Sequence, residues 1–478
     1  MMSEQPISYK NYIAGSWVEG EGTIPVTNKF TGDTYAFVYQ TSRDQVTEAV
    51  TSAKETFEKD TLSPTDRYHI LSKAADIMKE RKEELAQVMV AEVGKTITDA
   101  RTEVDRGINT LVVSAEEAKR IYGTGIPIQG EQGNEGKISY TMRVPVGVVG
   151  AITPFNFPFN LTIHKLGPAL AAGNTVVLKP AEVTPVIAMK ITEILEEAGL
   201  PKGYLQVVNG YGKDTGQYLL EDSRIAKYTF TGSAGVGKHI KAVTGIRKVT
   251  LELGNNSPNI VHHDVKDLDR AVELCTTRAI ANAGQACISV QRIFVHEDRY
   301  DEFVEKAKNR VERFVVGDPS NEATNIGPLI SEDAAKRVEA WVQEAESQGA
   351  NVVTGGKRDG SLYHPTILTD VTADMKVMCE EVFAPIMNIV KYSDIDEAFK
   401  EANASDFGLQ VGVFTADLDL AMKATKKLEF GGVIINNVST FRADIMPYGG
   451  VKDSGLGKEG PKYAIEELTD ERLVVIDS

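Results

Sequence analysis

Three residues of this chain have side chains that together could carry out chemistry on a carbonyl group. Cys287 lies in the segment Gly-Gln-Ala-Cys-Ile-Ser, Glu252 in Leu-Glu-Leu-Gly, and Asn156 in Pro-Phe-Asn-Phe-Pro. A thiolate can add to a carbonyl carbon, an amide N–H can stabilise the oxyanion, and a carboxylate can activate water to release a thioester. Each residue alone has a plainer explanation, because most lone cysteines are buried packing and a strand-end carboxylate can close a loop onto Lys or Arg. The prediction of covalent catalysis therefore rests on the set.

A cation and a carboxylate follow the predicted strand 175–178, in the segment Lys-Pro-Ala-Glu that begins at Lys179 and ends at Glu182. The carboxyl end of a parallel strand is where open α/β sheets bind ligands. A carboxylate at position 182 can accept both hydroxyls of a ribose and would repel a 2′-phosphate, so it favours NAD over NADP. A surface ion pair between the two side chains is the alternative that this segment leaves open.

A glycine-rich segment, residues 230–238, follows another predicted strand and opens a helix, so its backbone N–H groups could hold a phosphate. It nearly matches a P-loop, but that pattern requires Ser or Thr after Lys238 to bind Mg²⁺, and here His239 follows. A P-loop nucleotidase is therefore the second candidate function, which Mg²⁺-dependent nucleotide hydrolysis persisting in Cys287→Ala would identify. No Gly-x-Gly-x-x-Gly follows the first strand, so spacing alone does not establish a dinucleotide site.

The elements that must position these residues alternate between strands and helices. Short β-rich runs at 146–150, 175–178, 205–208 and 228–230 alternate with helical stretches such as 185–198. This alternation predicts a parallel, doubly wound sheet. A second α/β series follows it and places the cysteine at the entrance of a second domain. The other predicted elements are one long amphipathic helix at 65–92, helices at 268–283, 300–315 and 331–348, a strand at 292–295, and loops between short strands at 431–460.

Composition limits the classes of function. At 478 residues and 52.1 kDa the chain is too long for one ordinary core, so two large domains are expected. A formal charge of −16 opposes binding to nucleic acids or anionic membranes, and three cysteines without a Cys-x-x-Cys pair predict neither a disulfide framework nor a metal site. The first ten residues lack a basic region before an apolar run, and no segment is long and apolar enough to span a bilayer. The sequence predicts a cytoplasmic protein with a small-molecule substrate.

The motifs, taken in their order along the chain, resemble the aldehyde dehydrogenase superfamily. The similarity runs from Tyr-Ile-Ala-Gly-Ser-Trp at 12–17 to Tyr-Gly-Gly-Val-Lys-Asp-Ser-Gly at 448–455. It implies an α/β fold with a Rossmann-like NAD(P)-binding domain, a second α/β catalytic domain and a small β oligomerisation flap, and hence a homodimer or homotetramer. The implied limits are 1–121 and 146–256 for the first domain, 257–445 for the second, and 122–145 with 446–478 for the flap.

The resemblance also implies a role for each motif residue. Cys287 is the nucleophile, Glu252 is the base, and Asn156 forms the oxyanion hole with the backbone N–H of the nucleophile. NAD is the expected cofactor and NADP is the alternative. Without the resemblance, Glu381 and Phe383 would be an acidic loop and a core aromatic. The implied cofactor contacts are Lys179 and Glu182 on the ribose, Ser233 on the pyrophosphate with Gly232 beside it, Glu381 and Phe383 on the nicotinamide side, and Thr153 with Pro154.

The implied cycle is addition of Cys287 to an aldehyde, hydride transfer to the nicotinamide, and hydrolysis of the thioester by water activated at Glu252. Acylating relatives, which pass the acyl group to coenzyme A, lack this base, so a carboxylic acid is the expected product. Two departures limit the comparison. Asn255 and Asn256 stand where the family commonly has Gly and Lys, and Asn tolerates positive φ less freely, so a slightly altered backbone is expected. Ala286 stands where phosphate-selective relatives place Arg.

Residues 159–165 and 441–448 resemble the branch that contains lactaldehyde, non-phosphorylating glyceraldehyde-3-phosphate, and phosphono- or sulfo-aldehyde dehydrogenases. Members of that branch take short, often anionic aldehydes. We therefore hypothesise that Arg106 and Arg442 bind an anionic tail, since guanidinium groups hold phosphonate, sulfonate or carboxylate by bidentate bonds. An ion pair between Arg442 and Asp444 or an interdomain acid is equally open.

His164 has two expectations as well: it could donate a hydrogen bond to the substrate, or it could cap the helix that runs to Ala172. The same chemistry on neutral or aromatic aldehydes is the alternative activity. A non-catalytic structural relative is the third candidate function, although a scaffold has no physical need for the three catalytic residues. A single fast-reacting thiol with a depressed pKa at Cys287 would distinguish an enzyme from such a scaffold.

Overall fold

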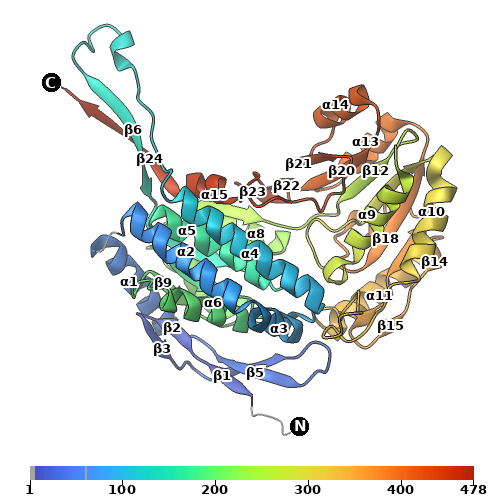
Figure 1. Ribbon diagram of the computed structural model, residues 1–478, viewed down its shortest axis with the longest axis horizontal. Coiled ribbons are helices and arrows are strands. Elements are labelled where there is room, and N and C mark those ends of the chain that lie inside the picture. The colour runs from blue at the N-terminus through green and yellow to red at the C-terminus, as the bar shows by residue number, and fades with distance from the viewer. Residues whose placement is uncertain (1–5, 60–61, 478) are drawn as a thin grey trace.

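The computed structural model describes residues 6–59 and 62–477 and consists of two lobes, each built on a mostly parallel sheet, with a ribbon that projects from the first lobe (Figure 1). The first five residues, on which part of the N-terminal prediction rests, lie outside the described residues. Among the described helices, none has the length and apolar character needed to cross a membrane.

The first sheet confirms the predicted parallel alternation. Its five central strands run parallel to one another, and the antiparallel pairs lie at the two edges. Each strand predicted in this region lies within two residues of its observed bounds. The order across the sheet is β23 (Gly455–Leu456), β11 (Lys248–Glu252), β10 (Lys227–Thr231), β7 (Val148–Ile152), β8 (Thr175–Lys179), β9 (Leu205–Val207), β2 (Asn11–Ile13) and β3 (Ser16–Val18).

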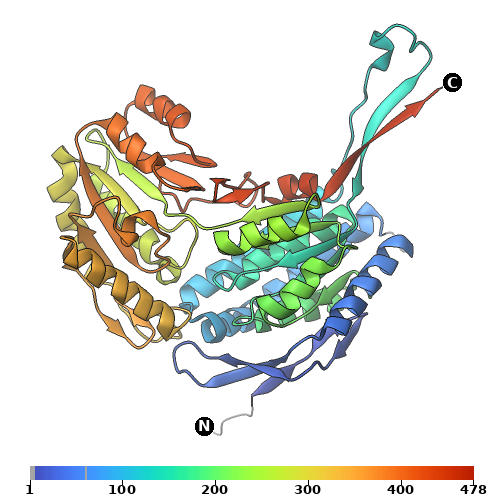
Figure 2. The same cartoon turned by 180° about the vertical axis from the view of Figure 1, so that it is seen from behind.

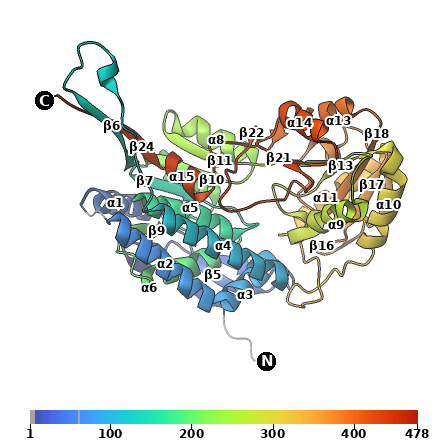
Figure 3. The ribbon, with the colours of Figure 1, turned by 45° about the horizontal axis from the view of Figure 1, so that its top comes forward.

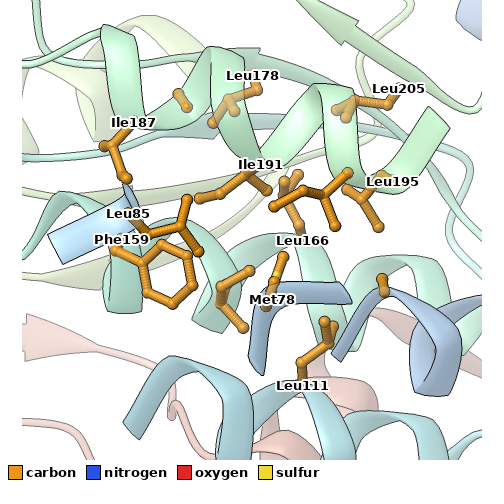
Figure 4. Close-up of a cluster of buried hydrophobic side chains, with 14 of the residues drawn as sticks. Met78, Leu85, Leu111, Phe159, Leu166, Leu178, Ile187, Ile191, Leu195 and Leu205 are labelled. Carbon is orange, nitrogen blue, oxygen red and sulfur yellow. The ribbon is translucent and has the colours of Figure 1, made fainter. Parts of the chain in front are cut away.

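Helices cover both faces of this sheet. On one face lie α5 (Pro158–Ala172) and α6 (Val186–Glu197), and on the other lie α1 (Arg43–Lys59) and α8 (Ala234–Thr244). A second helical layer packs outside α5 and α6, and Figure 4 shows apolar side chains from both layers meeting those of β8 and β9. Each fully buried side chain of this kind contributes about 1.5–3 kcal/mol. This core therefore fixes the positions of α5 and α6 on the sheet.

The helix predicted at 65–92 is in fact two helices, α2 (Pro64–Glu80) and α3 (Lys82–Val93). Arg81 leaves helical geometry between them, with φ −95° and ψ 16°. The first helix buries one face, whereas the second is buried on nearly all sides. The change of direction at Arg81 allows the second helix to enter the core, which periodicity cannot reveal because both halves are helical. The third helix of this layer, α4 (Ile97–Glu117), follows.

The second sheet is parallel except at one edge, where β14 pairs antiparallel with β17. Helices α9 (Leu268–Ile280) and α10 (Glu297–Val311) cover one face, and α11 (Glu332–Ser347) lies beside this lobe in Figures 1 and 2. The order across the sheet is β14 (Asn351–Thr354), β17 (Thr366–Thr369), β18 (Ile386–Tyr392), β13 (Arg292–His296), β12 (Pro258–Val261), β20 (Gln410–Phe414) and β21 (Gly432–Ile435).

The projecting ribbon consists of β6 (Ile138–Pro145) and β24 (Thr469–Ile476), which pair antiparallel over their whole length (Figure 2). It rises away from both lobes in Figures 1 and 3. β23 belongs to the first sheet and β22 (Val451–Lys452) pairs with β19 (Phe407–Gly408), so residues 446–477 do not all belong to the ribbon. The domain limits proposed from the sequence stay a prediction.

Candidate active site

A cavity of about 840 Å³ opens where β7, β8, β10 and β11 end, and residues of the second lobe close its other side. Figure 3 shows the two lobes that meet there. This is the sheet edge that binds ligands in doubly wound folds. The predicted site residues that border the cavity are Arg106, Thr153, Pro154, Asn156, Lys179, Glu182, Gly232, Ser233, Glu252, Cys287, Glu381, Phe383 and Arg442.

The Cys287 loop follows a kink at the end of α9. The helix stops at Ile280, earlier than predicted, and Asn282 then takes a positive φ of 52°. Gly284 has φ 72°, and a Cβ there would lie 2.1 Å from the carbonyl oxygen of Ala384, so only glycine fits. This tight turn presents the cysteine to the cavity.

The thiol of Cys287 is held in its neutral form in this structure. Its sulfur lies 3.2 Å from the hydroxyl of Tyr448. The side chain is partly exposed to the cavity, but protein surrounds its other sides, and this desolvation raises the pKa of the thiol to about 12. The depressed pKa expected of an activated thiol is therefore absent here, and the thiol must lose its proton as substrate binds.

Asn156 is buried beside the nucleophile loop. Its Nδ2 atom donates to the carbonyl oxygen of Gln285 at 3.0 Å, two residues before Cys287. A side-chain amide carries two N–H donors, so the second remains for an oxyanion. Asn282 connects the Asn156 segment to the Cys287 loop. Its side-chain amide donates to the carbonyl oxygens of Asn156 at 3.0 Å and Gln285 at 3.1 Å.

Glu252 ends β11 and is 2% exposed. Both carboxylate oxygens are buried without a hydrogen bond to any described residue, which argues against the alternative that this side chain closes a loop onto Lys or Arg. Burial, and then the negative charge of Glu459, raise the pKa of Glu252 well above its ordinary value. A buried carboxyl group without a partner, facing a cavity, has the properties of a general base for a bound water.

A second buried carboxylate lies close to this base. Glu459 is paired with Lys165 at 3.3 Å and with Arg442 at 3.1 Å. Although burial opposes ionisation, the charge of Lys165 and its other neighbours hold the pKa of Glu459 below its usual range. Of the two acids, Glu459 therefore loses its proton more readily than Glu252 does. Sequence reasoning missed both Glu459 and Lys165, although a lysine within a helix that is buried on all sides was a usable signal.

The other end of the cavity has the features of a nucleotide cradle. Ser233 is the N-cap of α8 and its side chain makes no capping bond, so its hydroxyl is available to a phosphate at a helix N-terminus. Lys179, which is 3% exposed, lies 3.4 Å from Glu182. Lys238 instead pairs with Asp453 at 2.5 Å and does not border the cavity, which removes the support for a P-loop nucleotidase. These residues fit a dinucleotide.

Glu381 and Phe383 border the cavity between its two ends. Glu381 accepts a hydrogen bond from the backbone N–H of Asn255 at 3.0 Å, and burial raises its pKa to about 7. Phe383 has φ 52° and packs edge-on against Phe155. Asn255 does not take a positive φ, so this position does not need the left-handed backbone that disfavours asparagine. The slightly altered backbone expected there stays a prediction.

The two arginines border the cavity but differ in their partners. The Nη2 atom of Arg106 forms an ion pair with Asp444 at 3.5 Å, and this buried atom makes no closer hydrogen bond to a described residue. Arg442 pairs with Glu459 rather than with Asp444, stacks on the Tyr448 ring at 3.8 Å, and donates to His164 at 3.2 Å.

His164 does not fulfil either expectation. It lies within α5 and is 2% exposed, and it is not among the residues that border the cavity. Arg442 stands between it and the cavity, so direct contact with a substrate is corrected to an indirect one through that guanidinium. A residue inside the helix cannot act as its cap.

Comparisons with known proteins agree with this arrangement. Residues 17–474 match the aldehyde dehydrogenase family. The chain is 54% identical over 469 residues to the 3-sulfolactaldehyde dehydrogenase of Priestia megaterium, with 98% of each chain covered. Aldehyde dehydrogenase 21 of Physcomitrella patens, solved in complex with the reaction product succinate, has a TM-score of 0.96 at 40% identity over 99% of both chains. Glyceraldehyde-3-phosphate dehydrogenase GapN of Methanocaldococcus jannaschii, complexed with NADP, has a TM-score of 0.91 at 39% identity over 95% of this chain and 99% of that chain.

Proposed function

Because the chain belongs to the aldehyde dehydrogenase family, we propose that it oxidises a short, anionic and hydroxylated aldehyde to the carboxylic acid, with NAD⁺ preferred over NADP⁺. One observation carries this proposal: a nucleophile, a carboxyl group without a hydrogen bond to any described residue, and a guanidinium whose buried Nη2 atom has only a 3.5 Å ion pair face a single cavity. They are Cys287, Glu252 and Arg106.

The chain's own groups account for the steps at the carbonyl carbon. The sulfur of Cys287 adds to this carbon as its proton passes to solvent in the cavity, and the oxyanion accepts hydrogen bonds from the Asn156 amide and the backbone N–H of Cys287. Bound NAD⁺, held by Lys179, Glu182 and Ser233, would accept the hydride. The resulting thioester is cleaved when water, deprotonated by Glu252, attacks its carbonyl carbon. The C–S bond breaks, Glu252 gives the proton that it took from water to the leaving sulfur, and the acid leaves.

The unpaired carboxyl group of Glu252 supports hydrolysis over transfer to a thiol acceptor. Its two oxygens have no hydrogen bond to described residues, so a water molecule has no competitor for them. A carboxylic acid is the product that this arrangement favours.

Arg106 supports an anionic substrate. Its buried Nη2 atom has only the 3.5 Å ion pair with Asp444, which is too long for a strong hydrogen bond, so an anionic ligand would add a shorter, charge-assisted bond. Arg442 is already held by Glu459 and His164, so it contributes positive charge more than free donors. The relatives named above point the same way: one is named for 3-sulfolactaldehyde and another was solved with succinate.

Turnover of matched aldehydes tests this proposal. Wild-type protein and Arg106→Gln would be assayed for NAD⁺ reduction with sulfo-, carboxy- and phospho-aldehydes and with neutral hydroxyaldehydes of equal length. We expect Arg106→Gln to raise KM for the anionic set about 10- to 100-fold, the effect of losing a charge-assisted bond, and to leave the neutral set nearly unchanged. Arg101→Gln, on the same helix but paired with Glu83 at the surface, is the matched control. Equal KM changes for both sets would rule out the anion site, whereas Cys287→Ala must abolish turnover of all of them.

We also propose that the ribbon of β6 and β24 binds a second copy of the chain. Its apolar side chains are exposed in the isolated chain, a pattern that marks an interface. Light scattering should give at least a dimer, and Leu473→Asp should shift it toward monomer at equal concentration. A monomeric wild-type protein would contradict this part of the proposal. The exposed apolar residues are Ile138, Tyr140, Met142, Leu473, Val475 and Ile476.

A further inference from the structure

One face of α4 contacts both segments that form the catalytic centre. Asp99, Glu103 and Arg106 are spaced at i, i+4 and i+7, which places their side chains on one side of the helix. Arg106 faces the proposed anion site, while the two acids hold backbone groups of neighbouring segments. No motif in the sequence points to either acid.

Glu103 holds the segment that carries Asn156. Its Oε1 atom accepts hydrogen bonds from the backbone N–H groups of Phe159 and Asn160, each at 3.0 Å, in the first turn of α5. These N–H groups have no partner within their own helix. The other oxygen of Glu103 forms a buried ion pair with Lys95. This carboxylate therefore fixes the start of α5 three residues after the amide that faces the oxyanion.

Lys95 and Gly107 further stabilise the packing of α4 against the start of α5. The Lys95 ammonium lies 3.7 Å from the centre of the Phe157 ring, next to Asn156 in the chain. A Cβ at Gly107 would lie 2.5 Å from the Phe159 ring, so the absence of a side chain allows α4 to approach α5 closely. The Asn156 segment is thus held against α4 from two sides.

Asp99 holds the other segment. Its Oδ2 atom accepts a hydrogen bond from the backbone N–H of Asn282 at 3.0 Å, within the positive-φ kink that precedes Cys287. The Asn282 side chain in turn donates to the carbonyl oxygens of Asn156 and Gln285. A single rigid helix therefore spans the distance between the nucleophile loop and the oxyanion donor.

We propose that Glu103, supported by Lys95, and Asp99 are positioning residues that set the geometry between the Asn156 amide and the Cys287 sulfur. This inference rests on the proposed catalytic roles of those two residues. A displacement of about 1 Å between reacting groups can lower a rate about 100-fold. Neither acid needs to touch the substrate to have such an effect.

Two pairs of variants test the inference without leaving a buried charge unpaired. Lys95→Met with Glu103→Gln keeps an oxygen that accepts both N–H groups, whereas Lys95→Met with Glu103→Ala removes it. We expect kcat of the Ala version to be about 10- to 100-fold below that of the Gln version, with KM for NAD⁺ unchanged within about twofold. Asp99→Ala should likewise lower kcat relative to Asp99→Asn, which keeps the acceptor for Asn282. Asp105→Asn, on the same helix and paired with Lys82 at the surface, should match wild type.

Alkylation of Cys287 by iodoacetamide separates positioning from general damage, because this reaction forms no oxyanion. The Glu103 variants should keep the wild-type alkylation rate while Asp99→Ala changes it. Equal kcat within each pair would overturn the inference, and if the Glu103 pair does not fold, the Asp99 pair decides alone. If the pairs have equal kcat, turnover by Asn156→Ala shows whether the catalytic role of Asn156 or only the inference is wrong. If it is fully active, the role of Asn156 is wrong and the inference falls with it; if it is inactive while the pairs match, only the inference is wrong.

Discussion

The sulfur of Cys287 lies 3.2 Å from the phenolic oxygen of Tyr448, and the ring of Tyr448 lies 3.8 Å from the guanidinium carbon of Arg442. The nucleophile is therefore connected to the positively charged end of the cavity through one aromatic side chain. Burial raises the pKa of the thiol, and the hydrogen bond with Tyr448 opposes that shift. Tyr448 thus has a direct influence on how readily the thiolate forms.

Tyr448→Phe should raise the pKa of the Cys287 thiol further. The ring and its stacking on Arg442 remain, and only the hydroxyl partner of the sulfur is lost. A hydrogen bond of this kind contributes about 1 kcal/mol, so the rate of iodoacetamide alkylation at pH 8 should fall about fivefold. The rate is measured against pH by mass spectrometry of the modified peptide. Faster alkylation in the variant would show that the hydroxyl stabilises the thiol rather than the thiolate.

Glu252→Gln should separate oxidation of the aldehyde from hydrolysis. Because water cannot be deprotonated, the variant should release a burst of about one NADH per active site and then turn over about 100- to 10,000-fold more slowly than wild type. Rapid-mixing absorbance at the NADH band measures both phases. An unchanged steady state would exclude Glu252 as the base.

The pH dependence of turnover should change in the same variant. A base works only when deprotonated, and burial raises the pKa of Glu252. Wild-type kcat should therefore rise with pH through that raised pKa, in a pH range above the ordinary pKa of a glutamate side chain. Glu252→Gln should lose this rise, while a variant of an exposed acid such as Asp105→Asn should keep it.

The positions of two of the three catalytic candidates could be predicted because their motifs follow strands that alternation locates. Glu252 ends β11 and Asn156 follows β7 by a short loop, so their meeting at one sheet edge is a property of the parallel fold. Cys287 instead follows α9 and precedes β13, so its predicted role rested on the set of motifs and on the family resemblance. Local sequence is sufficient where a side chain acts at the end of its own strand.

The groups that position these residues could not be predicted for a physical reason. Glu103 lies in an amphipathic helix rich in charged residues, and only the packing of α4 on α5 buries it beside Lys95. The partners of Tyr448 and Lys165 are likewise distant in sequence. Periodicity shows which face of a helix is buried, but it cannot show which buried acid meets which backbone group. The interpretation of His164 was wrong for the same reason, since Arg442 reaches it from across the fold.

Glu182→Gln should weaken the preference for NAD⁺. The carboxylate borders the cavity and lies 3.4 Å from Lys179, where it can accept ribose hydroxyls and repel a 2′-phosphate. Removing its charge should lower the ratio of kcat/KM for NAD⁺ to that for NADP⁺ about tenfold, the effect of about 1.4 kcal/mol. The ratio is measured with one aldehyde at saturation. Glu193→Gln, on the following helix and away from the cavity, is the control, and an unchanged ratio in Glu182→Gln would place cofactor selection elsewhere.

His164 should make the folded protein sensitive to mild acid. Burial, and then the charge of Arg442, lower the pKa of His164 from 6.5 to about 4. Between these two values the unfolded chain binds a proton that the folded chain does not, so stability falls as pH falls through this window. The full shift corresponds to about 3 kcal/mol, of which about 1 kcal/mol is lost between pH 7.5 and pH 5.5.

His164→Gln should therefore reduce the loss of stability on acidification. Glutamine keeps an acceptor for Arg442 but cannot take up a proton, so the midpoint of thermal unfolding should fall about 1–2 °C less than in wild type between pH 7.5 and pH 5.5. The two proteins are compared at one scan rate, because chains of this size often unfold irreversibly. His69→Gln, at an exposed position of α2, should follow wild type at both pH values. If His164→Gln loses as much stability as wild type, the buried imidazole is not the group that titrates, and the paired acids Glu252 and Glu459 become the groups to substitute next.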